Sequence, residues 1–110
     1  MNSIPMSEDK IWYKHIINKE NGVLGICVVE KGYEAYFHQH KEAEIYFFLH
    51  GVGRTFFDNK EHIIKSPNIV TIKGNTLHCM TPISDFVVLL YYFAEGPFEK
   101  IEYKYTSSKL

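Results

Sequence analysis

Ionisable side chains lie within strand-like, apolar sequence between residues 32 and 51, which read GYEAYFHQHKEAEIYFFLHG. His38 and His40 are two residues apart, so on a strand their side chains point to the same face. Glu44 lies further on, and a straight strand would place it roughly 20 Å beyond His38 at about 3.3 Å per residue. The three can share one ion only if the chain turns a corner at residues 41–43 and returns Glu44 on a neighbouring strand.

A fourth candidate ligand, His78, lies far downstream and has to be brought to the others by the fold. A buried carboxylate and three imidazoles would need many hydrogen-bond partners, whereas one divalent cation satisfies all four groups together. We therefore predict that His38, His40, Glu44 and His78 bind a divalent transition metal, with Fe, Mn, Ni and Zn all compatible. The alternative is a solvated strand face that holds no ion.

The spacing of these residues resembles the first motif of the cupin family. Every fixed position of that motif is present, in the order Gly32, His38, His40, Glu44 and Gly51. With the composition of this chain, such a match arises by chance with a probability of roughly 10⁻⁴.

The second cupin motif falls on residues 67–82, where the chain keeps the histidine, His78. Other residues stand where the family has Gly, Pro, Gly and Asn, namely Pro67, Lys73, Asn75 and Pro82. Asn75 is a mild exchange because asparagine tolerates the left-handed backbone that glycine would adopt. Lys73 in place of proline changes the expected path of the loop.

Over residues 22–94 the resemblance implies an all-β, single-domain jelly-roll (cupin) β-barrel with a metal inside. The length agrees, because 110 residues make one domain with a real core. We expect a polar N-terminal arm over residues 1–9, the barrel over residues 10–94 and a mixed C-terminal tail over residues 95–110.

Short segments rich in β-branched and aromatic residues, separated by turn residues, predict the strands. The expected strands cover residues 11–17, 23–30, 33–40, 44–50, 54–57, 62–64, 69–72, 77–80 and 86–93. Asp58 and Asn59 belong to the clearest hairpin turn. The segment 86–93, FVVLLYYF, is apolar throughout, which is typical of a strand covered on both faces.

Alternation along the strands predicts further inward side chains, which would line a substrate pocket: Tyr36, Tyr46, Phe48 and Met80. The two phenols would each need a hydrogen-bond partner, which a substrate or a metal-bound water could supply. Phe48 and Met80 are explained equally by core filling. Alternation does not decide whether Tyr91 or Tyr92 faces the cavity.

The remaining histidines are not part of the predicted set of metal ligands. We expect His15 and His62 to be ordinary surface or rim residues. His50 shares strand alternation with Glu44 and could line one end of the barrel without binding the ion. Cys27 and Cys79 make no disulfide framework and are expected to be free thiols in a reducing compartment.

Charge and hydropathy exclude several kinds of partner. The chain has 12 basic and 13 acidic residues and no basic stripe, so neither nucleic acid nor an anionic membrane is indicated. No apolar run approaches the length of a membrane span, and the first residues do not resemble a signal peptide. A cytoplasmic protein is the expectation. Open sheet edges and the polar arm favour a homodimer.

Three neutral imidazoles and one carboxylate leave a divalent ion with net positive charge and open coordination positions. The cupin resemblance implies either oxygenase or isomerase and lyase chemistry, on a small oxygenated molecule such as a sugar or a keto acid. A non-catalytic module that binds or senses a small ligand through the metal is the alternative, and a catalytically idle dimer is a third. Apart from the tyrosines and Glu42, no general base is evident.

Overall fold

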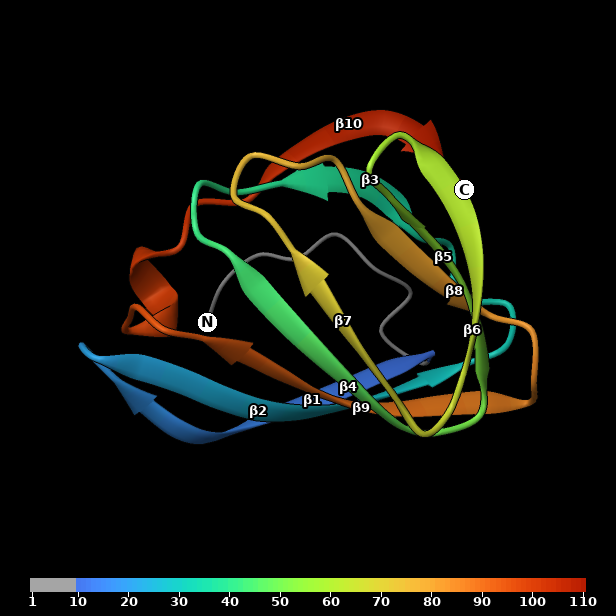
Figure 1. Ribbon diagram of the computed structural model, residues 1–110, viewed down its shortest axis with the longest axis horizontal. Helices are drawn as coiled ribbons and strands as arrows, with labels where there is room; N and C mark the ends of the chain where they lie inside the picture. The colour runs from blue at the N-terminus through green and yellow to red at the C-terminus, as the bar shows by residue number, and fades with distance from the viewer. Residues whose placement is uncertain (1–9) are drawn as a thin grey trace.

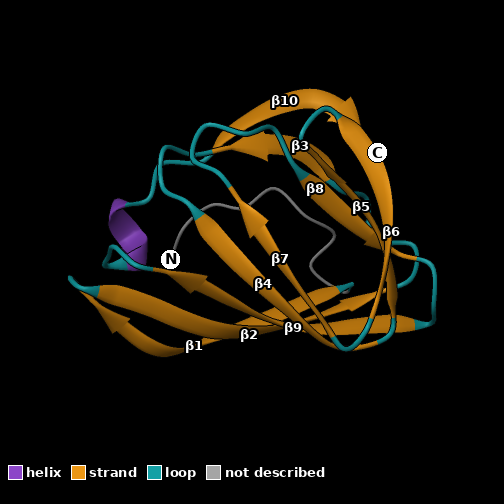
Figure 2. Cartoon of the chain, viewed as in Figure 1, coloured by secondary structure: helices purple, strands orange, loops and turns teal. Residues whose placement is uncertain are grey.

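The computed structural model describes residues 10–110, which form β-strands and one short 3-10 helix (Figure 2). The strands are β1 (Ile11–Lys19), β2 (Gly22–Glu30), β3 (Tyr36–Gln39), β4 (Glu44–His50), β5 (Val52–Phe57), β6 (Lys60–Lys65), β7 (Asn68–Ile72), β8 (Cys79–Pro82), β9 (Phe86–Phe93) and β10 (Lys104–Lys109). The helix, η1, spans Phe98–Lys100. The all-β class is thereby confirmed, and the expected arm over residues 1–9 lies outside the described residues.

Two layers of antiparallel strands enclose the core (Figure 1). One layer is a five-stranded sheet in the order β1-β2-β9-β4-β7. The other consists of a three-stranded sheet, β6-β5-β8, and a two-stranded sheet, β10-β3. An isolated bridge between His38 and His78 joins the β3 segment to the chain just before β8. The all-β jelly-roll class is confirmed, and its three sheets do not close into one hydrogen-bonded barrel, so the β-barrel of the prediction is an open one.

The corner that the ligand spacing demands is present. β3 ends at Gln39, the chain bends at residues 41–42, and β4 begins at Glu44. Because β3 and β4 belong to different sheets, His40 and Glu44 approach the same region from opposite layers. The loop before His78 packs onto this corner, since a Cβ on Gly74 would overlap the carbonyl oxygen of Lys41.

Left-handed backbone occurs at non-glycine residues where the sequence predicts turns. Asp58 and Asn59, with φ of 52° and 61°, form the turn between β5 and β6. Asn75, with φ of 61°, occupies the glycine position of the second motif. Both predictions are confirmed, because asparagine and aspartate are the residues that tolerate this region best after glycine.

The core lies between the layers and is filled from alternate positions of the strands. Val23, Phe48, Val87 and Phe93 are at most 1 % exposed. Cys27 and Cys79 are buried and free, as predicted. Within residues 10–110, no helix has the length and hydropathy that crossing a membrane requires.

Strand β9 is covered on one face by the described residues. Its inward side chains are Val87, Leu89, Tyr91 and Phe93, and the alternate ones, Val88, Leu90 and Tyr92, are only half-buried. The expectation that both faces are covered is therefore wrong for the part of the chain that the structure describes. The strand also resolves the open choice, because Tyr91 faces inward.

The C-terminal residues are part of the fold, where the sequence suggested a mixed tail. β10 pairs with β3, and Tyr105 lies opposite His38. Phe98 of η1 and Ile101 are only 2 % and 3 % exposed. The period-two pattern of Ile101, Tyr103 and Tyr105 between charged residues is the sequence signal that could have predicted this strand.

Candidate metal centre

Backbone carbonyl groups fix the rings of all three candidate histidines. The Nδ1–O distances are 3.0 Å for His38 with Tyr36, 2.9 Å for His40 with Glu42 and 2.7 Å for His78 with Thr76. A carbonyl oxygen only accepts hydrogen bonds, so each Nδ1 must carry a proton. A neutral ring then keeps its lone pair on Nε2, which is the form in which histidine binds a metal.

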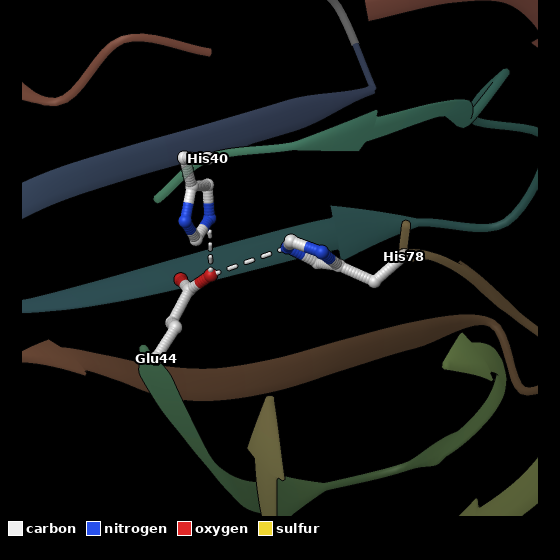
Figure 3. Close-up of side chains that lie close together, drawn as sticks. All are labelled: His40, Glu44 and His78. Atoms are coloured by element: carbon white, nitrogen blue, oxygen red, sulfur yellow. Dashed lines mark hydrogen bonds and ion pairs between the residues drawn. The ribbon is translucent and has the colours of Figure 1, made fainter. Parts of the chain in front are cut away.

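His40, Glu44 and His78 point at a common position (Figure 3). Oε1 of Glu44 lies 3.1 Å from Nε2 of His40 and 3.4 Å from Nε2 of His78. The candidate ligand atoms of the three residues all lie within 4.8 Å of one another. Neighbouring ligands on one ion, each about 2.1 Å from it, are separated by distances similar to the 3.1 and 3.4 Å between Oε1 of Glu44 and the two nitrogen atoms.

The buried nitrogen of His78 supports a cation at this position. Its Nε2 makes no hydrogen bond within residues 10–110, and its 3.4 Å approach to Glu44 is too long for a good one. The side chains of His78 and Glu44 are 1 % and 4 % exposed, so water does not compensate. A divalent ion satisfies both groups and the Nε2 atom of His40, so the residues present fit a metal.

His38 stands beside these three residues. Its ring centroid is 4.3 Å from that of His78 and 6.3 Å from that of His40. It is not in the group whose ligand atoms converge within 4.8 Å. The structure thus brings three of the four predicted ligands together, and ligation by His38 stays a prediction.

Glu44 is charged despite its burial. Burial alone would raise its pKa, but the hydrogen bond with His40 and the 3.4 Å approach of the His78 ring outweigh burial and lower the pKa of Glu44 to about 2. Burial would lower the pKa of His40, yet the hydrogen bond and charge of Glu44 outweigh it and hold that pKa above its usual value. In the metal-free protein a proton on Nε2 of His40 therefore occupies the place that a cation would take.

Metal-free protein is expected to lose stability as the pH falls from about 6.5 to about 5. Burial, and secondly the neighbouring His78, lower the pKa of His38 to about 3, well below its unfolded value. Stability from this residue is complete above the unfolded pKa and is lost as the pH falls towards the folded one. Its slope is at most about 1.4 kcal/mol per pH unit.

This pH window isolates His38 among the three groups. His40, with a raised pKa, affects the slope above about 6.5, and Glu44, with a lowered one, affects it below about 4.5. Urea unfolding in EDTA at several pH values measures the slope. A slope that is equally steep in the His38→Asn variant would contradict this assignment.

A cavity of about 120 Å³ lies beside the cluster, and seven of its 17 lining residues are tyrosines. The tyrosines that line it are Tyr13, Tyr33, Tyr36, Tyr46, Tyr91, Tyr103 and Tyr105. Glu44 and His38 also line it, and the lining contains no lysine or arginine among the described residues. Burial, with the charge of Glu44 second, raises the pKa of Tyr46 well above its usual value. The metal-free cavity is therefore lined by protonated hydroxyl groups and aromatic rings.

The predicted pocket residues divide into two groups. Tyr36, Tyr46 and Met80 line the cavity. Phe48 is not among its lining residues, and it packs edge-on against Tyr46 within the core, with the ring centroids 6.3 Å apart. The phenol of Tyr103, which the sequence analysis missed, joins the lining from the C-terminal segment.

The other histidines and the thiols stay outside the cluster that His40 forms with its two partners. Nδ1 of His15 is 2.9 Å from the hydroxyl group of Tyr91, so His15 is not an ordinary surface residue. His50 and His62 stack on aromatic rings near the ends of their strands. Burial raises the pKa of both cysteine thiols to about 12, which keeps them protonated and poor metal ligands.

Comparisons with known proteins place the chain in a family. A model of the AraC-like ligand binding domain matches residues 23–105. Dimethylsulfoniopropionate lyase DddW of Ruegeria pomeroyi is 33% identical to the chain over 86 residues. That alignment covers 78% of this chain and 57% of the lyase, so the chain spans little more than half the length of this curated relative.

Solved structures share the fold. The DMSP lyase DddQ from Ruegeria pomeroyi superposes with a TM-score of 0.78 and 18% identity, over 90% of this chain and 53% of that one. A cupin-like protein from Thermotoga maritima superposes with a TM-score of 0.74 and 20% identity, over 93% of this chain and 83% of that one. At these identities the likeness establishes the fold, and the chemistry has to be argued from the site.

Proposed function

Since the chain belongs to the family of AraC-like ligand-binding domains, which are cupins, we propose that it is a metal-dependent lyase. Its substrate would be a small molecule with a carboxylate at one end and a cationic onium group at the other. The observation that carries the proposal is the meeting of the Nε2 atoms of His40 and His78 with Oε1 of Glu44.

The ligands proposed for the ion are His38, His40, Glu44 and His78, and the candidate ions are Fe, Mn, Ni and Zn. A divalent ion bound by neutral imidazoles and one carboxylate keeps net positive charge and attracts an anionic oxygen ligand. The carboxylate of a substrate would supply such a ligand, and its binding would acidify the neighbouring C–H bond. Because Glu44 and His38 line the cavity, a carboxylate there reaches the centre directly.

The size of the cavity supports a small acid. Its volume is about 120 Å³, and benzene fills an apolar cavity of about 150 Å³. A substrate therefore has on the order of five to eight non-hydrogen atoms inside the protein. This favours a short acid over a sugar as the small oxygenated molecule.

The walls of the cavity support the onium group. Aromatic faces attract cations, and the described lining offers many phenol rings and no basic side chain that would repel one. The relative that is 33% identical is named for a substrate that joins a sulfonium group and a propionate. The same combination of groups matches a cavity with a cationic centre at one end and aromatic walls.

Tyr46 is the residue that we assign to proton transfer. It follows Glu44 as the next inward residue of β4 and lines the cavity. In the elimination, a base removes the proton beside the carboxylate, the electron pair forms a C=C bond, and the onium group leaves as a neutral molecule. A cation bound beside Glu44 would favour the phenolate form of Tyr46, and this phenolate would accept that proton.

A second candidate is a non-catalytic module that binds or senses the same class of ligand through the metal. It is favoured by the description of the family as a ligand-binding domain, and by the fact that the chain spans only 57% of the related lyase. It needs the same ion and the same cavity but no base.

The proposal predicts bound metal in protein purified without chelator, and turnover of dimethylsulfoniopropionate by Fe-, Mn-, Ni- or Zn-loaded protein. Elemental analysis measures the first, and gas chromatography of released dimethyl sulfide measures the second. The Tyr46→Phe variant should retain metal and lose turnover by about 100-fold or more. Saturable binding of dimethylsulfoniopropionate in calorimetry, with no product from any metal-loaded form, would favour the sensing module. Absence of stoichiometric metal would contradict both the lyase and the sensing module.

A further inference from the structure

One row of paired residues crosses the five-stranded sheet from the cavity to the edge strand β1. Tyr46 of β4 pairs with Tyr91 of β9, Tyr91 pairs with Gly25 of β2, and Gly25 pairs with His15 of β1. Residues paired in this way share one face of a sheet. Tyr46 and Tyr91 line the cavity, whereas His15 is not among its lining residues. The row therefore connects the cavity to a histidine outside it.

Gly25 makes this connection possible. A Cβ at this position would overlap Cζ and the hydroxyl oxygen of Tyr91, so the phenol ring lies across β2 where another residue would place its side chain. A glycine inside a strand often marks such a close approach. Beyond Gly25, the hydroxyl oxygen of Tyr91 lies 2.9 Å from Nδ1 of His15, which is hydrogen-bonding distance.

The chemistry of the two groups gives the direction of this hydrogen bond. Burial, opposed by the charge of Glu99, lowers the pKa of His15, and burial raises the pKa of Tyr91, so both groups are neutral at neutral pH. The imidazole nitrogen is the stronger base and the phenol the stronger acid, so the phenol donates its proton to Nδ1. The hydroxyl proton of Tyr91 is thereby engaged outside the cavity, and the lone pairs of its oxygen remain for a ligand inside.

This row lies one step along the strands from the candidate metal ligands. On β4, Tyr46 follows Glu44 by two residues, which is about 7 Å at about 3.3 Å per residue. On β9, Tyr91 is the same step away from Phe93, whose ring centroid is 5.2 Å from that of His40.

The length of the proposed ligand matches this step. In an acid with two methylene groups between its carboxyl carbon and its onium centre, three bonds of about 1.5 Å place these two atoms roughly 4 Å apart. The bond from a carboxylate oxygen to the ion adds about 2 Å. A carboxylate bound at the metal centre therefore brings the onium group to the row that contains Tyr91.

We propose that the hydroxyl oxygen of Tyr91, oriented by His15, receives the cationic end of the ligand. This inference rests on the proposed function, because it assigns one end of the same ligand. An onium group carries its charge on the surrounding C–H groups, which are attracted to oxygen lone pairs and to aromatic faces. His15 is a positioning residue, since it does not line the cavity but determines which side of the hydroxyl dipole the ligand meets.

Two acids of the same shape but different charge test the assignment, namely 3-(trimethylammonio)propionate and 4,4-dimethylpentanoate. The ammonium group leaves poorly, so calorimetry on Zn-loaded protein measures binding without turnover. Wild type should bind the ammonium acid more tightly. His15→Phe, which keeps a ring against Phe98, and Tyr91→Phe should each weaken binding of the ammonium acid by about 10-fold and of the neutral isostere by less than about twofold.

Conservative and matched variants separate this role from a structural one. His15→Asn should restore the preference for the ammonium acid, because its amide oxygen can accept the phenol proton. Tyr92→Phe removes a phenol from the outward face of the same strand and should leave both affinities unchanged. Near-ultraviolet circular dichroism and metal content establish that each variant is folded, and Tyr91→Phe keeps the test decisive if His15→Phe does not fold.

The hydrogen bond has a readout of its own. In ¹⁵N-labelled metal-free protein, the ring of His15 should show an unprotonated Nδ1 and a protonated Nε2. A proton on Nδ1, a wild type that binds the two acids equally, or equal weakening of both acids in the folded variants would overturn the assignment and leave the proposed function standing. Failure of the loaded wild type to bind either acid would contradict the proposed ligand class and this assignment with it. An inactive protein that distinguishes the two acids as described would contradict the lyase alone.

Discussion

The Glu44→Gln variant is expected to lose tight metal binding while its metal-free form stays folded. The carboxylate is the one negative ligand at the point where His40 and His78 meet, and the amide oxygen that replaces it is neutral. Replacing groups that only orient metal ligands costs 10- to 100-fold in affinity, so loss of the ligand itself should cost more than about 100-fold. Calorimetric titration with Zn and Mn, and thermal unfolding with and without metal, measure the change.

The physical reason for expecting a folded metal-free variant lies in the charges. Glu44 holds the pKa of His40 above its usual value against burial, so replacement by glutamine removes both the buried anion and the proton that it binds. The matched control is Glu42→Gln, a carboxylate that is 5% exposed and two residues away, outside the converging group. Equal loss of metal affinity in both variants would show that general electrostatics, and not ligation by Glu44, holds the ion.

The Gly74→Ala variant is expected to lose both stability and metal affinity. The added methyl group would overlap the carbonyl oxygen of Lys41, which is backbone and cannot rotate away. In the variant the loop must therefore move from the corner. This movement would strain the hydrogen bond from the amide of Asn75 to the carbonyl oxygen of His40, which is 2.7 Å long in the native protein. Overpacking of this kind, with one lost hydrogen bond, costs roughly 2–4 kcal/mol.

Movement of this loop carries His78 away from His40 and Glu44, so metal affinity should fall by roughly 10- to 100-fold. The matched control is Gly22→Ala, where the nearest atom to a new Cβ is at 3.4 Å and the cost should stay below about 1 kcal/mol. Urea unfolding of both metal-free variants, followed by metal titration, separates the two effects. Full metal affinity in a destabilised Gly74→Ala protein would show that the loop supports the fold without positioning the ligand.

The corner and the turns could be predicted because they follow from local chemistry. His38, His40 and Glu44 can approach one ion only around a bend, and the chain bends at residues 41–42. Asn75 adopts the left-handed conformation that its place in the second motif requires. In such cases the residues themselves restrict the backbone, so the sequence is sufficient.

The C-terminal wall of the cavity was missed because it depends on a distant partner. β10 pairs with β3 across more than sixty residues of sequence, and the Gly96–Pro97 break before the alternating tyrosines favours the prediction of an irregular tail.

The prediction for strand β9 was wrong for a related reason. Apolar residues on both faces indicate two covering surfaces, but they do not say whether the second belongs to the same molecule.

Polar residues of the candidate site and outward-facing apolar residues alternate along β4. Glu44 and Tyr46 face the metal centre and its cavity, whereas Ile45 and Phe47 face outward. Deletion of a single residue within this strand would exchange the two sets, placing hydrocarbon beside the ion and a carboxylate on the apolar exterior. Removing two residues would preserve the sides, so this segment should tolerate changes of length only in even steps.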